Sequence, residues 1–140
     1  MGLFDTAGEE DFDRLRPLSY SDTNVVLICF CVNHPASLSN VIYKWIPEVR
    51  HFCGRCPVML VACKIDLRDD LQTIERLNKQ DEQMITSDMA KQVAVEIKAD
   101  AYLECSAKTC EGVQTIFVQA ARLALENTSR RKKRLKCALY

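Results

Sequence analysis

Two uninterrupted apolar runs, joined by one amphipathic stretch, most constrain the fold of this 140-residue chain. Neither run, residues 24–32 (NVVLICFCV) or residues 58–63 (VMLVAC), carries a charge, and the first is rich in β-branched side chains. Such runs predict strands covered on both faces, as in parallel sheets. Between them, apolar residues at three- and four-residue spacing predict a helix from Pro35, which Pro47 kinks or splits. This right-handed crossover unit predicts an α/β fold, with helices on both faces of a mostly parallel sheet.

The rest of the chain extends this pattern and shows neither an internal repeat nor a second globular domain. Residues 69–83 are polar, with leucine and isoleucine at helical spacing, and predict a short, mostly exposed inserted helix. The sequence Thr86-Ser87-Asp88 supplies caps for the next helix. Residues 101–105 then predict a short strand, and the last helix is expected to begin near Gly112.

Three polar loops each follow a predicted strand. The first strand, Leu3 and Phe4, runs into Asp5 and the loop Thr6-Ala7-Gly8-Glu9. The second loop, residues 63–66 (CKID), follows the second buried run, and the third, residues 104–108 (ECSAK), follows the last strand. Open α/β sheets bind ligands at the carboxyl ends of their strands, so these loops predict one shared ligand site.

In this order, the loops resemble the second switch, the [NT]KxD motif and the ECSAK motif of Rho-family small GTPases, a branch of the Ras superfamily. Residues 13–20 (DRLRPLSY) and the pair Leu67-Arg68 resemble the Rho branch closely. The resemblance assigns residues 1–128 to a partial small-GTPase domain, with the insert helix of that branch at about 69–83. It implies a fold of the P-loop NTPase type that is incomplete at its N-terminus, because no G-x-x-x-x-G-K-[ST] motif occurs in the 140 residues.

The same resemblance implies GTP or GDP as ligand, with Mg²⁺. Asp5 would contact the metal through water, and Gly8 would sense the γ-phosphate. Lys64 and Asp66 would read guanine, while the N–H of Ala107 would favour guanine over adenine. The nucleotide-binding set implied in this way is Asp5, Thr6, Ala7, Gly8, Glu9, Cys63, Lys64, Asp66, Leu67, Ser106, Ala107 and Lys108.

Two residues depart from the family pattern within these motifs. Glu9 occupies the catalytic position of the glutamine that orients the attacking water. An ionised glutamate accepts hydrogen bonds but donates none, so slow hydrolysis of GTP to GDP is expected. Cys63 stands where the family has asparagine or threonine, and a thiol is a weaker hydrogen-bonding group. Lower nucleotide affinity is therefore expected.

The last twelve residues, 129–140, form a separate tail in this interpretation. Cys137-Ala138-Leu139-Tyr140 fits the C-a-a-X pattern of prenylation at Cys137, although tyrosine is an unusual final residue. Six basic residues precede it: Arg130, Arg131, Lys132, Lys133, Arg134 and Lys136. Lipid and basic charge together predict attachment to the cytoplasmic face of the plasma membrane. The alternative is a solvated charge run or a nuclear address.

The leading hypothesis is a membrane-anchored, GTP-hydrolysing switch that acts in signal transduction and controls the actin cytoskeleton. Its partners would be the family's exchange factors, activating proteins, dissociation inhibitors and effectors. The formal net charge of zero gives no reason to expect nucleic acid. The alternative is an interaction module that competes for the same partners without hydrolysing GTP or binding nucleotide stably.

A third hypothesis is a thiol redox or zinc protein built on Cys53 and Cys56. This C-x-x-C has no second pair of cysteine or histidine residues at zinc spacing. It also follows a predicted helix instead of opening one, as a redox motif does. The pattern favours a loop with two incidental thiols.

Overall fold

The structure is a computed structural model that describes residues 2–137 of the chain, with side chains described up to residue 129. Its sheet has three parallel strands in the order β1 (Val26–Cys31), β2 (Val58–Cys63) and β3 (Ala101–Glu104). Val26 pairs with Val58, and Met59 pairs with Ala101. The predicted α/β class and parallel sheet are therefore confirmed.

Helices connect the strands and follow the last of them. The α-helices are α1 (Pro35–Asn40), α2 (Ile46–Cys53), α3 (Leu71–Lys79), α4 (Ser87–Glu96) and α5 (Val113–Cys137). The shorter turns are the 3₁₀ segments η1 (Glu10–Phe12), η2 (Arg16–Tyr20) and η4 (Ile65–Asp69) and the π-helical turn η3 (Val41–Trp45). Within residues 2–137, no helix combines the length and apolarity needed to cross a bilayer.

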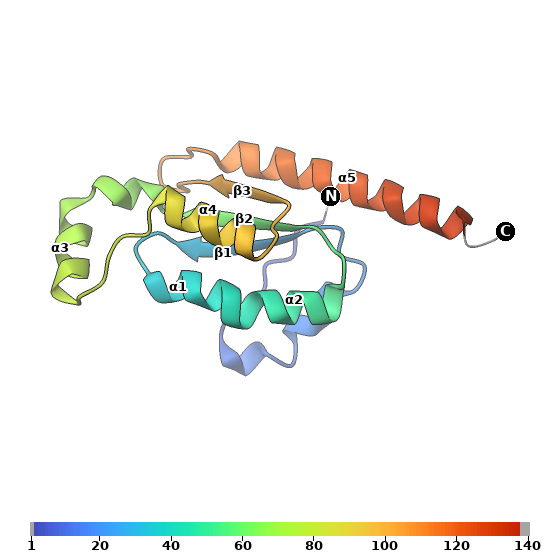
Figure 1. Cartoon of the computed structure of the whole chain (residues 1–140), viewed down its shortest axis with the longest axis horizontal. Coiled ribbons are helices and arrows are strands. Elements are labelled where there is room, and N and C mark those ends of the chain that lie inside the picture. Colours follow the sequence, from blue (N-terminus) through green and yellow to red (C-terminus); the bar gives the residue numbers. More distant parts are fainter. Residues whose placement is uncertain (1, 138–140) are drawn as a thin grey trace.

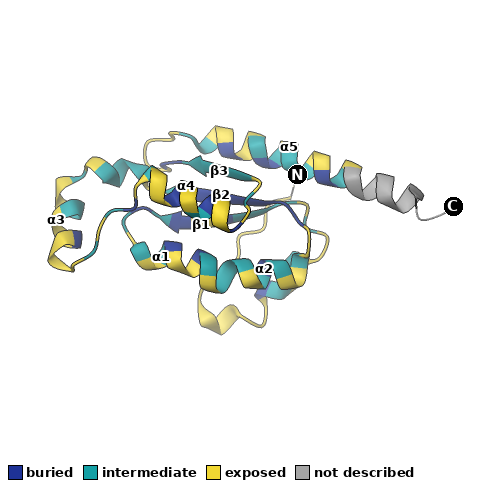
Figure 2. Ribbon diagram, viewed as in Figure 1, coloured by how far each residue is buried: buried dark blue, intermediate teal, exposed yellow. Residues whose placement is uncertain are grey.

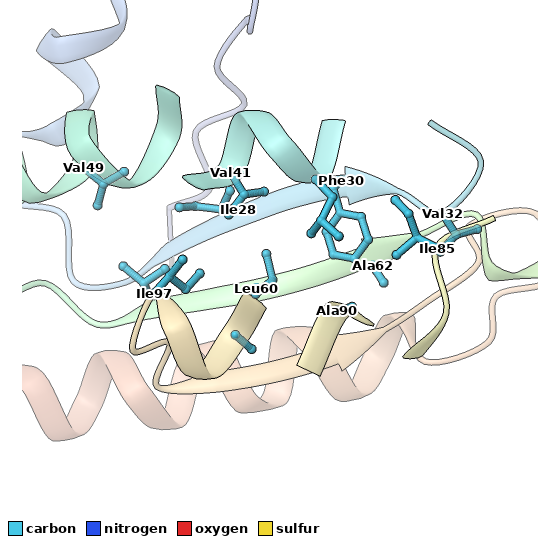
Figure 3. Close-up of a cluster of buried hydrophobic side chains, with 13 residues drawn as sticks. Ile28, Phe30, Val32, Val41, Val49, Leu60, Ala62, Ile85, Ala90 and Ile97 are labelled. Carbon is cyan, nitrogen blue, oxygen red and sulfur yellow. The ribbon is translucent and has the colours of Figure 1, made fainter. Parts of the chain in front are cut away.

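The sheet lies between two helical layers (Figure 1). One face carries α1, α2 and α4, and its core is built on the buried side chains of Phe30, Leu60 and Ala90 (Figure 3). The other face is covered by α5, whose Ile116 and Ala120 pack on alternate residues of β2. Figure 2 shows β2 buried between the two layers, whereas α3 stands largely exposed at one end of the sheet. The helix predicted over 69–83 is therefore present, in shorter form.

Pro47 interrupts the helix between the first two strands, as the sequence predicts. Proline has no N–H to donate to the preceding turn. The chain widens into η3 just before it, and the Ile46 N–H bonds to Val41 O, five residues back. Such π turns commonly absorb a residue that cannot continue the regular ladder.

The strand predicted at Leu3 and Phe4 is wrong. Residues 2–8 have no regular structure, and the Leu3 and Phe4 side chains are 64% and 81% exposed. A strand forms only where a neighbour pairs with its backbone groups. In the described part of the chain, β1 pairs only with β2 and no strand pairs with residues 3–5.

Candidate functional site

The loop after β2 is shaped by a left-handed lysine. Lys64 has φ 62° and ψ 38°, which turns the chain sharply out of the strand and into η4. The Leu67 N–H donates to Lys64 O at 3.0 Å, and the Ile65 N–H donates to Cys105 O at 3.3 Å. The second contact ties this loop to the end of β3. Lys64 is exposed above the loop, while Asp66 and Leu67 are half-buried in it.

Asp66 is oriented by a buried serine from the neighbouring loop. Ser106 is fully buried, and its hydroxyl donates to Asp66 Oδ1 at 2.5 Å. The same hydroxyl accepts from the Thr109 N–H at 3.2 Å, which fixes its direction. Ala107 and Lys108 follow on the exposed side of this turn. The structure therefore brings the loops 63–67 and 106–108 together, as the sequence predicts.

A glycine keeps the second loop compact. Gly112 has φ +72°, and a Cβ atom added there would lie 2.1 Å from the backbone oxygen of Glu104. Only glycine allows α5 to begin so close to the end of β3. The sequence marked Gly112 as a helix start, but this close approach was not visible in it.

An ion pair that the sequence analysis did not find braces the same loops. The Arg68 guanidinium binds both oxygens of Glu104, at 2.6 and 2.9 Å, and its Nε donates to Ile85 O. The Tyr102 hydroxyl donates to the same carboxylate. The Arg68 hydrogen bonds hold the pKa of Glu104 at about 2. The only sequence signal for this brace was the Leu67-Arg68 pair that follows Asp66.

Acid is expected to weaken the fold through Glu104. Its pKa lies at about 2 in the folded chain, against an ordinary value of 4.5. The stabilisation is fully present above the unfolded pKa and is lost as pH falls from there towards the folded pKa. It amounts to on the order of 2 kcal/mol. Urea unfolding between about pH 6 and pH 2.5 would show a smaller loss of unfolding free energy in Glu104→Gln than in the unchanged chain.

The control for this acid effect is Glu75→Gln, because Glu75 is exposed on α3. This variant should retain the pH dependence of the unchanged chain. If the free energy of unfolding fell equally with pH in Glu104→Gln and in the unchanged chain, the ion pair with Arg68 would not be what lowers the pKa of Glu104.

Cys63 lies at the end of β2 among other thiols. It pairs with Cys31 across the sheet, and the Cys63 O accepts from the Val32 N–H at 3.1 Å. A hydrogen bond with the Cys29 thiol, together with burial, raises the pKa of Cys63 above its usual range. The Cys63 thiol therefore stays protonated near neutral pH. It offers the loop that begins at Lys64 only a neutral group that forms weak hydrogen bonds.

The predicted residues 5–9 share no described hydrogen bond or ion pair with these loops, residues 63–67 and 106–108. All five are exposed. Thr6 instead lines a cavity of about 500 Å³ beside residues 19–27 and α5. The described hydrogen bonds therefore join the two base-reading loops. Among the described residues, Asp5 is linked to this end of the sheet only by its electrostatic interaction with Cys29, the thiol that bonds to Cys63.

Residues 5–20 are held by Arg16, another residue whose role the sequence analysis missed. Its Nε donates to Ala7 O at 3.1 Å, and its Nη2 donates to Glu9 O at 3.3 Å. The guanidinium also binds Asp13 and reaches Glu48 of α2 at 3.1 Å. It lies over the Trp45 ring, 4.8 Å from the centroid. Arg16 thus anchors the loop to the helix beneath it.

The two implied ligands fit these residues to different degrees. Asp66 offers a carboxylate already oriented by Ser106, and no described backbone carbonyl accepts from the Ala107 N–H. Both features suit the edge of guanine. For Mg²⁺, the chain offers Asp5 as one exposed carboxylate, and residues 2–129 contain no group of three or more suitable ligand residues. Mg²⁺ commonly keeps several waters and takes few protein ligands, so Asp5 fits as one of them.

Comparison with known proteins identifies the chain's relatives. A sequence model of the Ras family matches residues 1–126. "GTP-binding protein RHO1" of Candida albicans is 53% identical over 139 residues, covering 99% of this chain and 70% of that protein. "GTP-binding protein RHO1" of Saccharomyces cerevisiae is 51% identical, covering 99% and 71%. "GTP-binding protein rho5" of Schizosaccharomyces pombe is 56% identical over 125 residues, covering 89% and 62%.

The chain therefore belongs to the Ras family, since the match covers most of its length. Within that family it is a Rho-type small GTPase, because relatives of this type match nearly the whole chain at about half identity. These relatives confirm the predicted family, and they do not favour the alternative of an interaction module that lacks stable nucleotide binding.

Proposed function

We propose that this chain binds guanine nucleotide as a Rho-type molecular switch. The observation that carries the proposal is the contact of Ser106 with Asp66, which fixes a carboxylate between two strand-end loops. Relatives that match nearly the whole chain are named GTP-binding proteins, which supports the same ligand.

Guanine would be selected by the pattern of donors and acceptors at its edge. Asp66 would accept from the ring N–H and from the exocyclic amino group, and the Ala107 N–H would donate to the carbonyl oxygen. Adenine presents an amino group where guanine has that carbonyl. Two donors, this amino group and the Ala107 N–H, would then face each other and form no hydrogen bond. The aliphatic stem of Lys64 would cover the ring, since long basic side chains pack their methylene groups on apolar surfaces.

At the phosphate end, Asp5 would hold a water of Mg²⁺, and Gly8 would bring its backbone close to the γ-phosphate. Bound Mg²⁺ would neutralise charge on the phosphate oxygens. The exposed loop from Asp5 to Glu9 suits a close approach of backbone groups, because its side chains do not cover them.

Titration of the purified chain with fluorescent GDP and ADP, with and without Mg²⁺, tests this proposal. GDP is expected to bind with a clear preference over ADP, and Mg²⁺ is expected to strengthen GDP binding. Circular dichroism on the same samples shows whether the chain is folded. A folded chain that binds neither nucleotide, or binds both equally, would contradict the proposal.

Replacing Glu9 with glutamine should speed GTP hydrolysis. A glutamine amide can donate to and accept from the attacking water, whereas the carboxylate adds negative charge beside the γ-phosphate. Glu9 is exposed, and its side chain makes no capping hydrogen bond, so the change should leave the fold intact. Single-turnover hydrolysis by GTP-loaded protein is expected to rise about tenfold or more. A rate that the substitution leaves unchanged would exclude Glu9 as the cause of slow turnover.

Signalling partners would dock on the segment that Arg16 anchors. Phe12 and Leu18, on its two 3₁₀ turns, are 44% and 74% exposed, and Leu15 between these turns is 58% exposed. Exposed apolar side chains of this kind mark protein interaction sites. Exchange factors, activating proteins, dissociation inhibitors and effectors are the partner classes that the Rho resemblance supports. The same resemblance supports a role in actin control.

The C-terminal tail would attach the protein to the cytoplasmic face of the plasma membrane. Prenylation of Cys137 and the basic residues 130–136 would act together, because a single lipid chain anchors only marginally. Each basic residue adds about 1 kcal/mol near an anionic surface. The side chains of residues 130–140 lie outside the described residues.

Cys137→Ser is expected to release the protein from membranes in a cell fractionation experiment. Loss of the lipid would remove one of the two attachment signals, so most of the protein should move to the soluble fraction. Cys110→Ser, which changes an exposed cysteine elsewhere, provides the control. Membrane association that survives the loss of Cys137 would rule out lipid anchoring at this residue.

A further inference from the structure

Cys53 and Cys56 are the two ends of one tight turn. The Cys56 N–H donates to Cys53 O at 3.2 Å, and Gly54 between them has φ 58° and ψ −107°. These angles belong to a type II′ turn, which takes glycine at its first central position. The end residues of a β-turn have Cα atoms less than about 7 Å apart, and disulfides span nearly the same range.

Both thiols are directed at a second turn, formed by residues 20–23. Cys53 Sγ lies 3.8 Å from Tyr20 O, and Cys56 Sγ lies 3.5 Å from Thr23 O. The Thr23 N–H donates to Tyr20 O at 3.3 Å, so these two carbonyls end a turn of the same length. The two turns thus face each other end to end, which places both sulfur atoms on one side of the Cys53–Cys56 turn.

The two thiols differ in access to solvent. Cys53 is half-buried at the end of α2, whereas Cys56 is only 1% exposed. This difference in exposure would let a dissolved oxidant reach Cys53, while Cys56 could react only with the neighbouring Cys53. Residues 2–129 contain no group of three or more residues able to hold a metal ion, so the pair is not part of a zinc site there.

We propose that Cys53 and Cys56 form an oxidisable dithiol whose oxidant is a hydroperoxide. The Cys53 thiolate attacks a peroxide oxygen, the O–O bond breaks, and the leaving oxygen departs as water or an alcohol after taking a proton. Cys53 is then a sulfenic acid. The Cys56 sulfur attacks it, the S–S bond forms, the S–O bond breaks, and hydroxide leaves as water with the Cys56 proton. Two electrons pass from the two sulfurs to the peroxide, and an external dithiol reverses the reaction by exchange.

Oxidation would alter the link between residues 5–20 and β1. In the disulfide neither sulfur carries a hydrogen, so Tyr20 O and Thr23 O lose their thiol donors. The turn at residues 20–23 joins η2 to β1, and Tyr20 also contacts Glu48 and stacks on Phe52. Amide hydrogen exchange in residues 18–24 should therefore be faster in the oxidised chain.

Mass spectrometry of the full chain after treatment with hydrogen peroxide tests this proposal. Trypsin cuts after Arg55, which separates Cys53 in residues 51–55 from Cys56 in residues 56–64. A disulfide would keep these two peptides joined, with a loss of about 2 Da relative to the separate peptides and release by dithiothreitol. Fragmentation of the joined pair distinguishes Cys56 from Cys63, which lies in the same peptide.

Three variants sharpen the result. Cys53→Ser should abolish the joined peptides, and because Cys53 is half-buried, this variant is expected to fold. Cys56→Ser should instead trap a sulfenic acid on Cys53, detectable with dimedone. Cys110→Ser, at an exposed cysteine in another loop, should leave the joined peptides unchanged. The proposal is overturned if the unchanged chain gains oxygen on Cys53 without joining the peptides, or if Cys53 links to Cys63.

Discussion

Asp66→Asn is expected to weaken GDP binding by about 3 kcal/mol, roughly a 100-fold rise in Kd. The carboxylate can accept from both N–H groups on the guanine edge, and hydrogen bonds to a charged group contribute about 1.5–3 kcal/mol each. Asparagine keeps one acceptor oxygen, but its amino group would face one of the two N–H donors of guanine, so that hydrogen bond would be lost. Because the asparagine oxygen can still accept from Ser106, the contact that fixes this loop is retained. Titration with fluorescent GDP measures the change.

Two comparisons separate base recognition from general damage at this position. Asp69→Asn removes the same charge from an exposed residue three positions later and should leave GDP affinity unchanged. Xanthine carries a carbonyl where guanine has its amino group, so Asp66→Asn should bind xanthosine diphosphate better than the unchanged chain does. If the variant bound GDP as tightly as the unchanged chain, Asp66 would not contact the base.

The elements predicted best from the sequence are those that depend on local composition. β2 has the predicted bounds, because a continuous apolar run lies between Pro57 and the polar loop that follows. The interruption at Pro47 was also predictable, since it follows from a missing N–H. Leu3 and Phe4 show the limit of this reasoning. Their apolar pair resembles a strand locally, but a strand also needs a partner across the sheet.

The candidate site was predicted in part for a similar reason. Strand-end loops can be recognised from spacing, so the meeting of residues 63–67 with residues 106–108 was predictable. The ion pairs that brace these segments were not predictable, because a sequence does not show which distant residue a charged side chain binds. Arg68 pairs with Glu104 thirty-six positions away, and Arg16 pairs with Glu48 thirty-two positions away. At Cys53 and Cys56 the spacing left two interpretations open, and only the backbone angles of Gly54 reveal the turn that brings the pair together.

Arg16→Ala is expected to lower the free energy of unfolding by about 3 kcal/mol, roughly a 10 °C lower Tm. The Arg16 side chain is only 3% exposed, and its partner Glu48 is 15% exposed. Removing the cation leaves the Glu48 carboxylate half-buried with the Tyr20 hydroxyl as its donor. Burial and that same contact raise the pKa of Tyr20, so the hydroxyl stays protonated but supplies no positive charge. The carbonyls of Ala7 and Glu9 lose their donor as well.

Part of this loss should appear as local opening, because Arg16 is the link between residues 5–20 and α2. Hydrogen exchange in residues 10–20 should therefore accelerate more than exchange in β2. Arg16→Lys keeps the positive charge but loses the planar guanidinium with its several donors. Its Tm and exchange rates should therefore lie between those of Arg16→Ala and the unchanged chain. Arg14→Ala changes an exposed arginine two positions earlier and should match the unchanged chain. If Arg16→Ala showed the Tm and exchange rates of Arg14→Ala, the buried guanidinium would not be the anchor, and the loop would be held by its two 3₁₀ turns alone.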